Sequence, residues 1–306
     1  EWVGATDADG YAEVIPLDRY VEFMKMSRAL RDENLPLIAI IPVEGTLMPG
    51  DSEQGMAGSD TINGYIDTVL EAEDLAAIVL RVNSPGGSVF ASDLIRRKLS
   101  EVTDAGIPIV VSMGTVAASG GYWIAAEADE IWALPTTLTG SIGAFTAFPT
   151  IEGIVEYIGV TADGVGTTPL AGAASFNRGL SPEMASIVQA LAYGAYDDFI
   201  ELVASGRDMS EQAVRDVADG LIWTGAEAAD RGLVDELGGL DEAVAAAARL
   251  AGVEEWRTAR TQVPPSFESV LLRELSSSFG IVAAPLGGWF ESLVRALTPA
   301  IKSLSN

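Results

Sequence analysis

Apolar residues gather into short runs in the first half of the chain, with amphipathic segments between them. The runs "LIAIIPV", "AAIVLRVN", "IPIVVSM" and "EIWALP" begin at residues 37, 76, 107 and 130. Short continuous runs rich in Val and Ile are typical of strands that are buried on both faces of a parallel sheet. The intervening segments predict helices over residues 59–72, 88–105 and 119–126. Strands that alternate with helices predict an α/β fold.

A helical pattern dominates after residue 181. Apolar side chains recur every three or four positions in residues 182–205, which predicts one long helix. Two shorter helices are predicted to begin at caps on Ser210 and Thr224, and the second is predicted to stop at Gly232. The stretch "GGLDEAVAAAARLAG" then predicts an alanine-rich helix.

The two ends of the chain differ in composition from its middle. Residues 1–36 are polar and mixed, which predicts a connector. Residues 256–306 are rich in Pro, Ser and amphipathic segments, which predicts a helical tail. The tail segments carry Glu268, Glu274 and Glu291. Because a helix on a membrane surface needs a basic polar face, packing against the domain or a neighbouring subunit is the favoured interpretation of the tail. The main domain is therefore predicted over residues 37–255.

Length and charge narrow the possible functions. A chain of 306 residues, 48% hydrophobic and 20% charged, can bury a large core. A net charge of -26 with only three lysines argues against a nucleic-acid partner. Residues 107–126 and 131–151 reach the length of a membrane span, but turn residues interrupt both. The chain starts with Glu1 and its first residues do not resemble a signal peptide, so we expect a fragment or a processed chain.

The chain contains neither histidine nor cysteine. This composition excludes a Ser-His-Asp triad, a thiol nucleophile, a disulfide and nearly every zinc arrangement. No carboxylate motif for a hard metal ion is present, so the sequence predicts no cofactor. A serine nucleophile in this chain would need a base other than histidine.

Two glycine-containing turns follow consecutive predicted strands. They are "NSPGGS" at residues 83–88 and "AASGG" at residues 117–121. Adjacent parallel strands deliver their following turns to the same edge of the sheet, so these turns are expected to face each other. The backbone N–H of Gly86 or Gly87 and that of Gly120 would then form an oxyanion hole beside the Ser119 hydroxyl. Taken alone, "SPGG" is equally well explained as a strand-to-helix turn, and a lone serine in an Ala/Gly turn is more often a helix cap than a nucleophile.

The linked motifs carry a family resemblance. "RVNSPGGS", "VVSMGTVAASGGYWIA" and "TTLTGSIG" are similar to the serine-bearing half of the long form of signal peptide peptidase A, a relative of Clp protease in the crotonase-like superfamily. The similarity runs from about Pro42 to Val253. It implies repeated ββα units around a parallel sheet and a Ser/Lys catalytic dyad. It also implies Ser119 as nucleophile and Ser141 as the residue that orients the lysine amine, although Ser141 could simply be a turn serine.

The lysine itself is missing from the expected place. In the short form of the family it lies about fifty residues after the nucleophile, but here that region reads "ADGVGTTPLAGAASFNRGLS". In the long form two similar halves are fused, and the N-terminal half contributes the lysine. Lys25 falls in the connector, and Lys98 lies beside Arg96 and Arg97 on a predicted helix face. The general base is therefore expected outside this chain.

The resemblance also implies partners and a location. It implies signal peptide remnants and other short hydrophobic or unfolded peptides as substrates, the N-terminal half as a partner, and a homotetramer. Membrane association is expected through a segment outside this chain, with the catalytic part on the extracytoplasmic side of the inner membrane. The apolar residues that could line the cleft are Val116, Ala118, Ile142 and Phe145.

Two other functions remain open from the sequence. A crotonase-type acyl-CoA hydratase or isomerase would share the paired turns and would use carboxylates such as Glu127 and Glu130 as acid and base. A catalytically inert scaffold would also explain a half that lacks its lysine.

Overall fold

The computed structural model describes residues 35–168 and 170–261. The chain divides into two compact units, residues 1–261 and 262–306, and all described residues belong to the first. The helical tail and nearly all of the connector predicted from the sequence lie outside the described residues.

A parallel sheet forms the centre of the first unit. Its strands run in the order β10-β7-β5-β4-β1-β12, and β11 and β6 join it through the pairing of β6 with β5. All pairs in this sheet are parallel except that of β10 with β7. The strands are β1 (Leu37–Glu44), β4 (Leu75–Ser84), β5 (Ile109–Ala118), β6 (Glu130–Ala133), β7 (Leu138–Gly140), β10 (Ile222–Thr224), β11 (Glu236–Leu237) and β12 (Arg257–Arg260).

Strand β5 organises the end of the sheet that carries the predicted site. Its first residues pair with β6 and its last three with β7, so a single strand serves two different neighbours. Two small pairs stand apart from the main sheet. They are β2 (Thr46–Met48) with β3 (Met56–Gly58), and β8 (Ala174–Ser175) with β9 (Gly179–Leu180).

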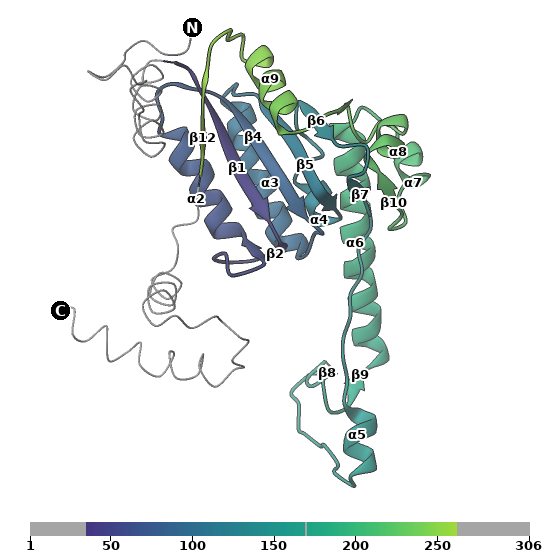
Figure 1. The fold of residues 1–306 in the computed structure, drawn as a ribbon. Helices are drawn as coiled ribbons and strands as arrows, with labels where there is room; N and C mark the ends of the chain where they lie inside the picture. Colours follow the sequence, from purple (N-terminus) through teal and green to yellow (C-terminus); the bar gives the residue numbers. More distant parts are fainter. Residues whose placement is uncertain (1–34, 169, 262–306) are drawn as a thin grey trace, which may run out of the picture. The chain divides into compact units, whose positions relative to one another are not determined.

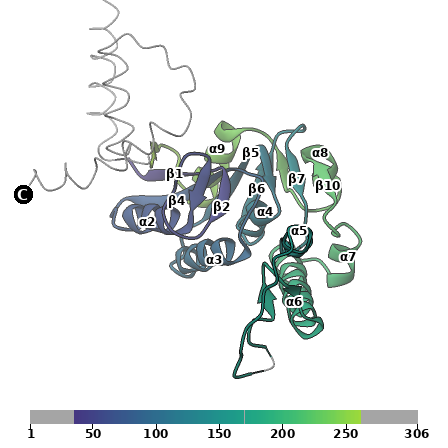
Figure 2. The same ribbon diagram turned by 90° about the horizontal axis from the view of Figure 1, so that it is seen from below.

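Helices cover both faces of the sheet, as Figure 2 shows. The helices are α2 (Ser59–Leu70), α3 (Val89–Asp104), α4 (Gly120–Trp123), α5 (Glu152–Tyr157), α6 (Pro182–Gly206), α7 (Glu211–Arg215), α8 (Gly225–Asp230) and α9 (Leu240–Leu250). Ile66 of α2 and Ile95 of α3 are fully buried in the larger core, while α9 closes a second core on the opposite face. Each such buried aliphatic side chain contributes roughly 1.5–3 kcal/mol relative to an exposed one. The α/β fold with a parallel sheet that the sequence predicts is confirmed.

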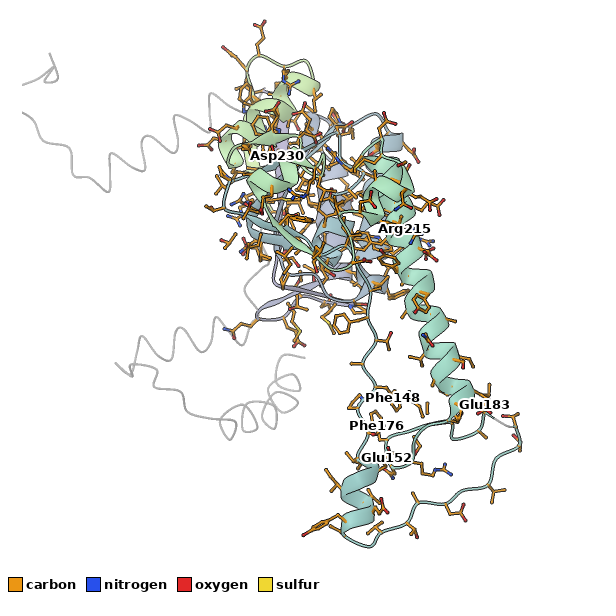
Figure 3. The ribbon with its side chains drawn as sticks, turned by 90° about the vertical axis from the view of Figure 1, so that its right-hand side faces the viewer. Phe148, Glu152, Phe176, Glu183, Arg215 and Asp230 are labelled. Carbon is orange, nitrogen blue, oxygen red and sulfur yellow. The ribbon has the colours of Figure 1, made fainter. Side chains whose placement is uncertain are left out.

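Helix α6 is buried at one end only. Phe199 and Val203, near its C-terminus, are buried in the core, whereas Leu191, two turns earlier, is exposed. In Figure 1 the N-terminal part of α6 leads away from the sheet toward β8, β9 and α5. We call residues 144–180, which precede this helix, the arm. The rings of Phe148 and Phe176 stack with their centroids 5.3 Å apart, so the segment near the start of the arm contacts the segment near its end (Figure 3).

The local signals for helix ends are largely borne out. Ser210 and Thr224 accept hydrogen bonds from the backbone of α7 and α8, and Gly232 follows α8 with a φ of +74°. The helix predicted from residue 119 is shorter than expected, because α4 ends at Trp123. The preceding strand is longer than expected and reaches Ala118.

Within residues 35–168 and 170–261, no helix is both long and apolar enough to cross a membrane.

Candidate active site

Ser119 occupies a strained turn between β5 and α4. Its φ is 52° and its ψ is -122°, a region that residues with a side chain rarely adopt. The Ser119 N–H donates to Gly140 O at 2.9 Å, and its carbonyl accepts from the backbone of Tyr122 and Trp123. Ser119 is the N-cap residue of α4 by position, but its hydroxyl makes no capping bond to the helix. A sharp strand-turn-helix of this kind is how hydrolases present a nucleophilic serine.

The two glycine turns meet, as the sequence predicts. Gly86 has a φ of +99°, and a methyl group added to it would lie 2.7 Å from both the nitrogen of Gly120 and the Cβ of Ser119. Only a residue without a side chain fits this contact. The backbone of the first turn therefore lies directly against the serine of the second.

The two glycine N–H groups of the first turn differ in their hydrogen bonding. The Gly86 N–H donates to Ser84 Oγ at 3.1 Å, so it is already satisfied. Gly87 forms a parallel bridge with Leu47. In this bridge the Leu47 N–H donates to Gly86 O at 2.9 Å, and the Ser88 N–H donates to Leu47 O at 2.8 Å. In such a bridge the N–H of the central residue points away from the partner strand. A methyl group on Gly120 would lie 3.3 Å from the Gly87 nitrogen, so this nitrogen lies close to the second turn.

Ser141 lies beside Ser119 because of the pairing of β5 with β7. Ala118 and Gly140 are register partners at the ends of β5 and β7, and a serine directly follows each strand. Ser141 also has a left-handed backbone, with a φ of 50°, and its N–H donates to Leu221 O at 2.7 Å. The structure therefore brings together the two serines that the sequence singles out, 22 positions apart.

The turn that supports Ser141 was not predicted from the sequence. Gly220 donates to Ile142 O at 3.0 Å, and Asp219 before it has a φ of 56°. Tyr196 of α6 donates its hydroxyl proton to Asp219 Oδ1 at 2.8 Å. Burial, followed by this hydrogen bond, raises the pKa of Tyr196, so it remains a donor at neutral pH. The dipeptide Asp-Gly was the available signal, because both residues tolerate the left-handed conformation.

The four predicted wall residues differ in accessibility. Val116 is half-buried and Phe145 is 92% exposed, so both could contact a peptide. Ala118 and Ile142 are buried, and Ile142 has no exposed surface because it belongs to the main core. Ile142 therefore supports the turn of Ser141 from inside, and it does not line a cleft in this structure.

The charged residues that the sequence offers as acid or base are engaged in ion pairs. Lys98, the one lysine among the described residues, contacts Asp67 and Glu101 at 2.7 Å each. These carboxylates raise its pKa, the opposite of what a general base requires. The Lys98 side chain is 21% exposed, so it is a partly buried, ion-paired residue of α3.

The carboxylates considered for a hydratase are also paired. Glu127 accepts from Arg96 at 2.9 Å, and Glu130 accepts from Arg249 at 2.7 Å.

The described residues contain no group of three Asp or Glu side chains that could hold a metal ion.

Comparison with known proteins assigns the family. A model described as "Peptidase family S49" matches residues 101–254. A protein of Synechocystis sp. named as a protease is 36% identical over 217 residues, which cover 71% of this chain and 75% of that protein. The chain belongs to peptidase family S49. Other members among its relatives are Protease 4 of Haemophilus influenzae, 44% identical over 244 residues, and "Serine protease SPPA, chloroplastic" of Arabidopsis thaliana, 34% identical over 299 residues.

This family member spans only part of its longer relatives. The matched segment is 79% of this chain but 39% of Protease 4 from H. influenzae, and it is 88% of this chain but 44% of the A. thaliana protein. A solved structure, a ClpP1 mutant from Listeria monocytogenes, matches 67% of this chain and 94% of its own at 16% identity and a TM-score of 0.44. That likeness is too distant to bear on the site.

Proposed function

We propose that this chain is the serine-bearing half of a Ser/Lys peptidase, with Ser119 as nucleophile. The observation that carries the proposal is the strained backbone of Ser119, held against Gly86 at the edge of the sheet where β5 ends. Strain of about 1–3 kcal/mol persists where the surrounding structure holds it, and such sites are commonly catalytic. A hydroxyl that caps no helix, in a peptidase family, is best explained as a reactive group.

The reaction follows from the groups around this serine. The Ser119 Oγ attacks the carbonyl carbon of a peptide while a lysine amine accepts its proton. The carbonyl electron pair moves onto the oxygen, which the N–H groups of Gly87 and Gly120 stabilise. Collapse of this intermediate breaks the C–N bond, and the protonated lysine returns the proton to the departing amine. Water then cleaves the acyl-enzyme by the same steps.

The lysine comes from the other half of a longer protein. Two facts support this part of the proposal: Lys98 is paired with two carboxylates, and the chain covers only 39% of Protease 4 from H. influenzae. A lysine acts as a base only when its pKa falls toward neutrality, which burial in an apolar cleft achieves. The Ser141 hydroxyl, next to Ser119, can accept a hydrogen bond from the neutral amine and orient it.

The substrates are short hydrophobic or unfolded peptides, including signal peptide remnants, and the working form is a homotetramer at the outer face of the inner membrane. The arm supports assembly, since Tyr157 and Val165 are almost fully exposed there and Ile154 is 63% exposed. Apolar side chains gathered on one projecting segment favour an interface with another chain. An enclosed cleft would admit extended peptides and exclude folded proteins.

Covalent labelling of Ser119 tests the proposal. A fluorophosphonate should label the full-length protein, and the label should map to Ser119 by mass spectrometry. Ser119→Ala should abolish both labelling and cleavage of an apolar peptide without lowering the midpoint of thermal unfolding by more than a few degrees. An acyl-CoA hydratase would bind CoA and take no label, and an inert scaffold would neither bind CoA nor react; either result would reject the peptidase.

Ser141→Ala tests the second serine in the same assays. The neutral amine loses a hydrogen-bond partner, so its pKa rises and a larger fraction is protonated at a given pH. Turnover should fall, and the acid limb of the profile of kcat/KM against pH should move to higher pH. Ser186→Ala, at an exposed hydroxyl on α6, is the control and should leave the profile unchanged. A profile and turnover unchanged by Ser141→Ala would exclude Ser141 from the mechanism.

A further inference from the structure

Ser84 is a fully buried polar residue at the end of β4, and the mechanism above assigns it no role. Its side chain has no exposed surface, and its register partner in β5 is Ala117, two residues before the nucleophile. The Ser84 Oγ accepts the N–H of Gly86 at 3.1 Å. A buried hydroxyl in this position is directly bonded to the turn that faces Ser119.

The same residue also touches the second turn. A methyl group added to Gly121 would lie 2.7 Å from the Ser84 carbonyl oxygen and 3.4 Å from its Cβ. Gly121 is the second residue after Ser119, so Ser84 lies between the turn of Gly86 and the turn of Ser119. The Ser84 backbone therefore packs closely against the second turn, while its side chain is bonded to the first.

The turn held by Ser84 is intrinsically adaptable. Gly86 and Gly87 both have positive φ values, +99° and +152°, and glycine backbones rotate with little steric resistance. Either glycine N–H could turn toward the site. By accepting the Gly86 N–H, the Ser84 hydroxyl fixes the peptide unit that precedes Gly86 and engages that N–H. The next peptide unit is held by the bond from the Leu47 N–H to Gly86 O, which turns the Gly87 N–H away from Leu47.

We propose that Ser84 is a positioning residue of the peptidase, one that selects the Gly87 N–H as oxyanion donor by engaging the Gly86 N–H. The proposal rests on the proposed function for its catalytic consequence. The hydrogen bond between Ser84 and Gly86 can be examined without any activity. A residue of this kind affects the transition state more than the bound substrate, because the donor matters only when charge develops on the carbonyl oxygen.

Ser84→Ala in the full-length protein tests the catalytic effect. Removal of a whole oxyanion donor costs about 100-fold to 1,000-fold in kcat. Misdirection of one donor should therefore lower kcat by about 10-fold to 100-fold, with KM changed by less than about threefold. A peptide aldehyde, which forms a hemiacetal with Ser119, should bind more weakly by a factor similar to the loss in kcat. The matching peptide alcohol forms no such adduct and should bind as it does to the wild type.

Ser112→Ala is the matched control. Ser112 is also fully buried, lies in the neighbouring strand β5, and accepts a hydrogen bond from Arg81 at 2.8 Å. Its loss should lower the free energy of unfolding, as the loss of Ser84 Oγ should, but kcat and aldehyde affinity should be retained. Equal losses of kcat in the two variants would show that Ser84 acts only through stability and would overturn the proposal.

Hydrogen exchange separates this inference from the proposed function. Removal of the acceptor bonded to the Gly86 amide should speed exchange in a peptide that spans residues 84–88 of the Ser84→Ala variant, and Ser112→Ala should leave that peptide unchanged. A wild-type protein without peptidase activity would reject the proposed function, whereas unchanged exchange or unchanged kcat in Ser84→Ala would reject the role of Ser84.

Discussion

Ser119 has a strained backbone, which hydrogen bonds to neighbouring residues stabilise. A positive φ in this sparsely populated region costs a residue with a side chain about 1–3 kcal/mol. The bond from its N–H to Gly140 O and the two bonds to its carbonyl hold that conformation in place. Ser141 repeats the arrangement, with a φ of 50° and a short bond to Leu221 O. Two neighbouring serines with strained backbones indicate that this part of the fold holds both hydroxyl groups in fixed positions.

Gly86 provides a residue-level prediction. In Gly86→Ala the new methyl group would lie 2.7 Å from the Gly120 nitrogen and from the Ser119 Cβ, at a φ of +99°. We expect a loss of about 2–4 kcal/mol in the free energy of unfolding, since backbone strain and overpacking add, and a loss of peptidase activity of at least about 100-fold. Chemical denaturation and peptide cleavage measure the two effects.

Gly106→Ala is the control for this substitution. Gly106 also has a positive φ, +79°, but a methyl group there meets nothing within 4 Å. It should lose about 1 kcal/mol through backbone strain alone and should keep wild-type activity. If Gly86→Ala behaves like Gly106→Ala in both assays, the close contact between the turns is not required for catalysis.

At the scale of elements, α6 contacts both supports of the candidate site. Phe199 packs against Trp123 of α4 with ring centroids 4.7 Å apart, and Tyr196 bonds to Asp219 in the turn that holds Ser141. Arg215 of α7, labelled in Figure 3, has its guanidinium 5.5 Å from the centroid of the Tyr196 ring. It also forms an ion pair with Asp197. The buried end of this long helix therefore stabilises the turns that carry both serines.

Two glycines of α6 test this contact. A methyl group at Gly206 would overlap the carbonyl oxygen of Ala126, just after α4, whereas one at Gly194 meets nothing within 4 Å. Gly206→Ala should therefore destabilise the fold by about 1–3 kcal/mol and lower activity by displacing α4. Gly194→Ala should stabilise it by about 0.5–1 kcal/mol, because alanine favours the helix. Similar shifts of the unfolding midpoint in the two variants would contradict the close approach of α6 to α4.

At the scale of the whole molecule, the exposed arm bears on assembly. Ile154, Tyr157 and Val165 remain exposed in a segment of otherwise mixed composition. Their burial against another copy would remove apolar surface from water, at roughly 25 cal/mol per Å². The acidic composition, with a net charge of -26, opposes association, so a tetramer would form only if the apolar contacts outweigh charge repulsion.

Substitution of the arm tests assembly. The full-length protein in detergent should scatter light as a tetramer, and the double variant Ile154→Asp and Tyr157→Asp should dissociate to smaller species. Leu250→Asp adds a charge at an exposed apolar position of α9, outside the arm, and should leave the tetramer intact. Dissociation in both variants, or a wild-type monomer with full activity, would show that the arm does not mediate assembly.

The sequence by itself determined the main elements and the pair of turns. Strands β1, β4 and β5 were predicted because a strand buried on both faces must be apolar throughout, and α6 was predicted because one of its faces is apolar at helical spacing. The meeting of the two glycine turns followed from a general rule, that adjacent parallel strands end at the same edge. These features depend on residues that are close in sequence, or on topology that the alternation of elements implies.

Only the tertiary structure decided how the backbone of the first glycine turn is bonded. Glycine allows many φ values, so neither the bond from the Gly86 N–H to Ser84 nor the bridge between Gly87 and Leu47 could be predicted from the local sequence. Strand β12 pairs with β1 although "RTAR" carries no apolar pattern, because the pairing uses backbone groups of segments that are far apart in the sequence. The burial of Ile142 and the support of Ser141 by the turn at Asp219 arise in the same way, from contacts between distant segments that no local pattern encodes.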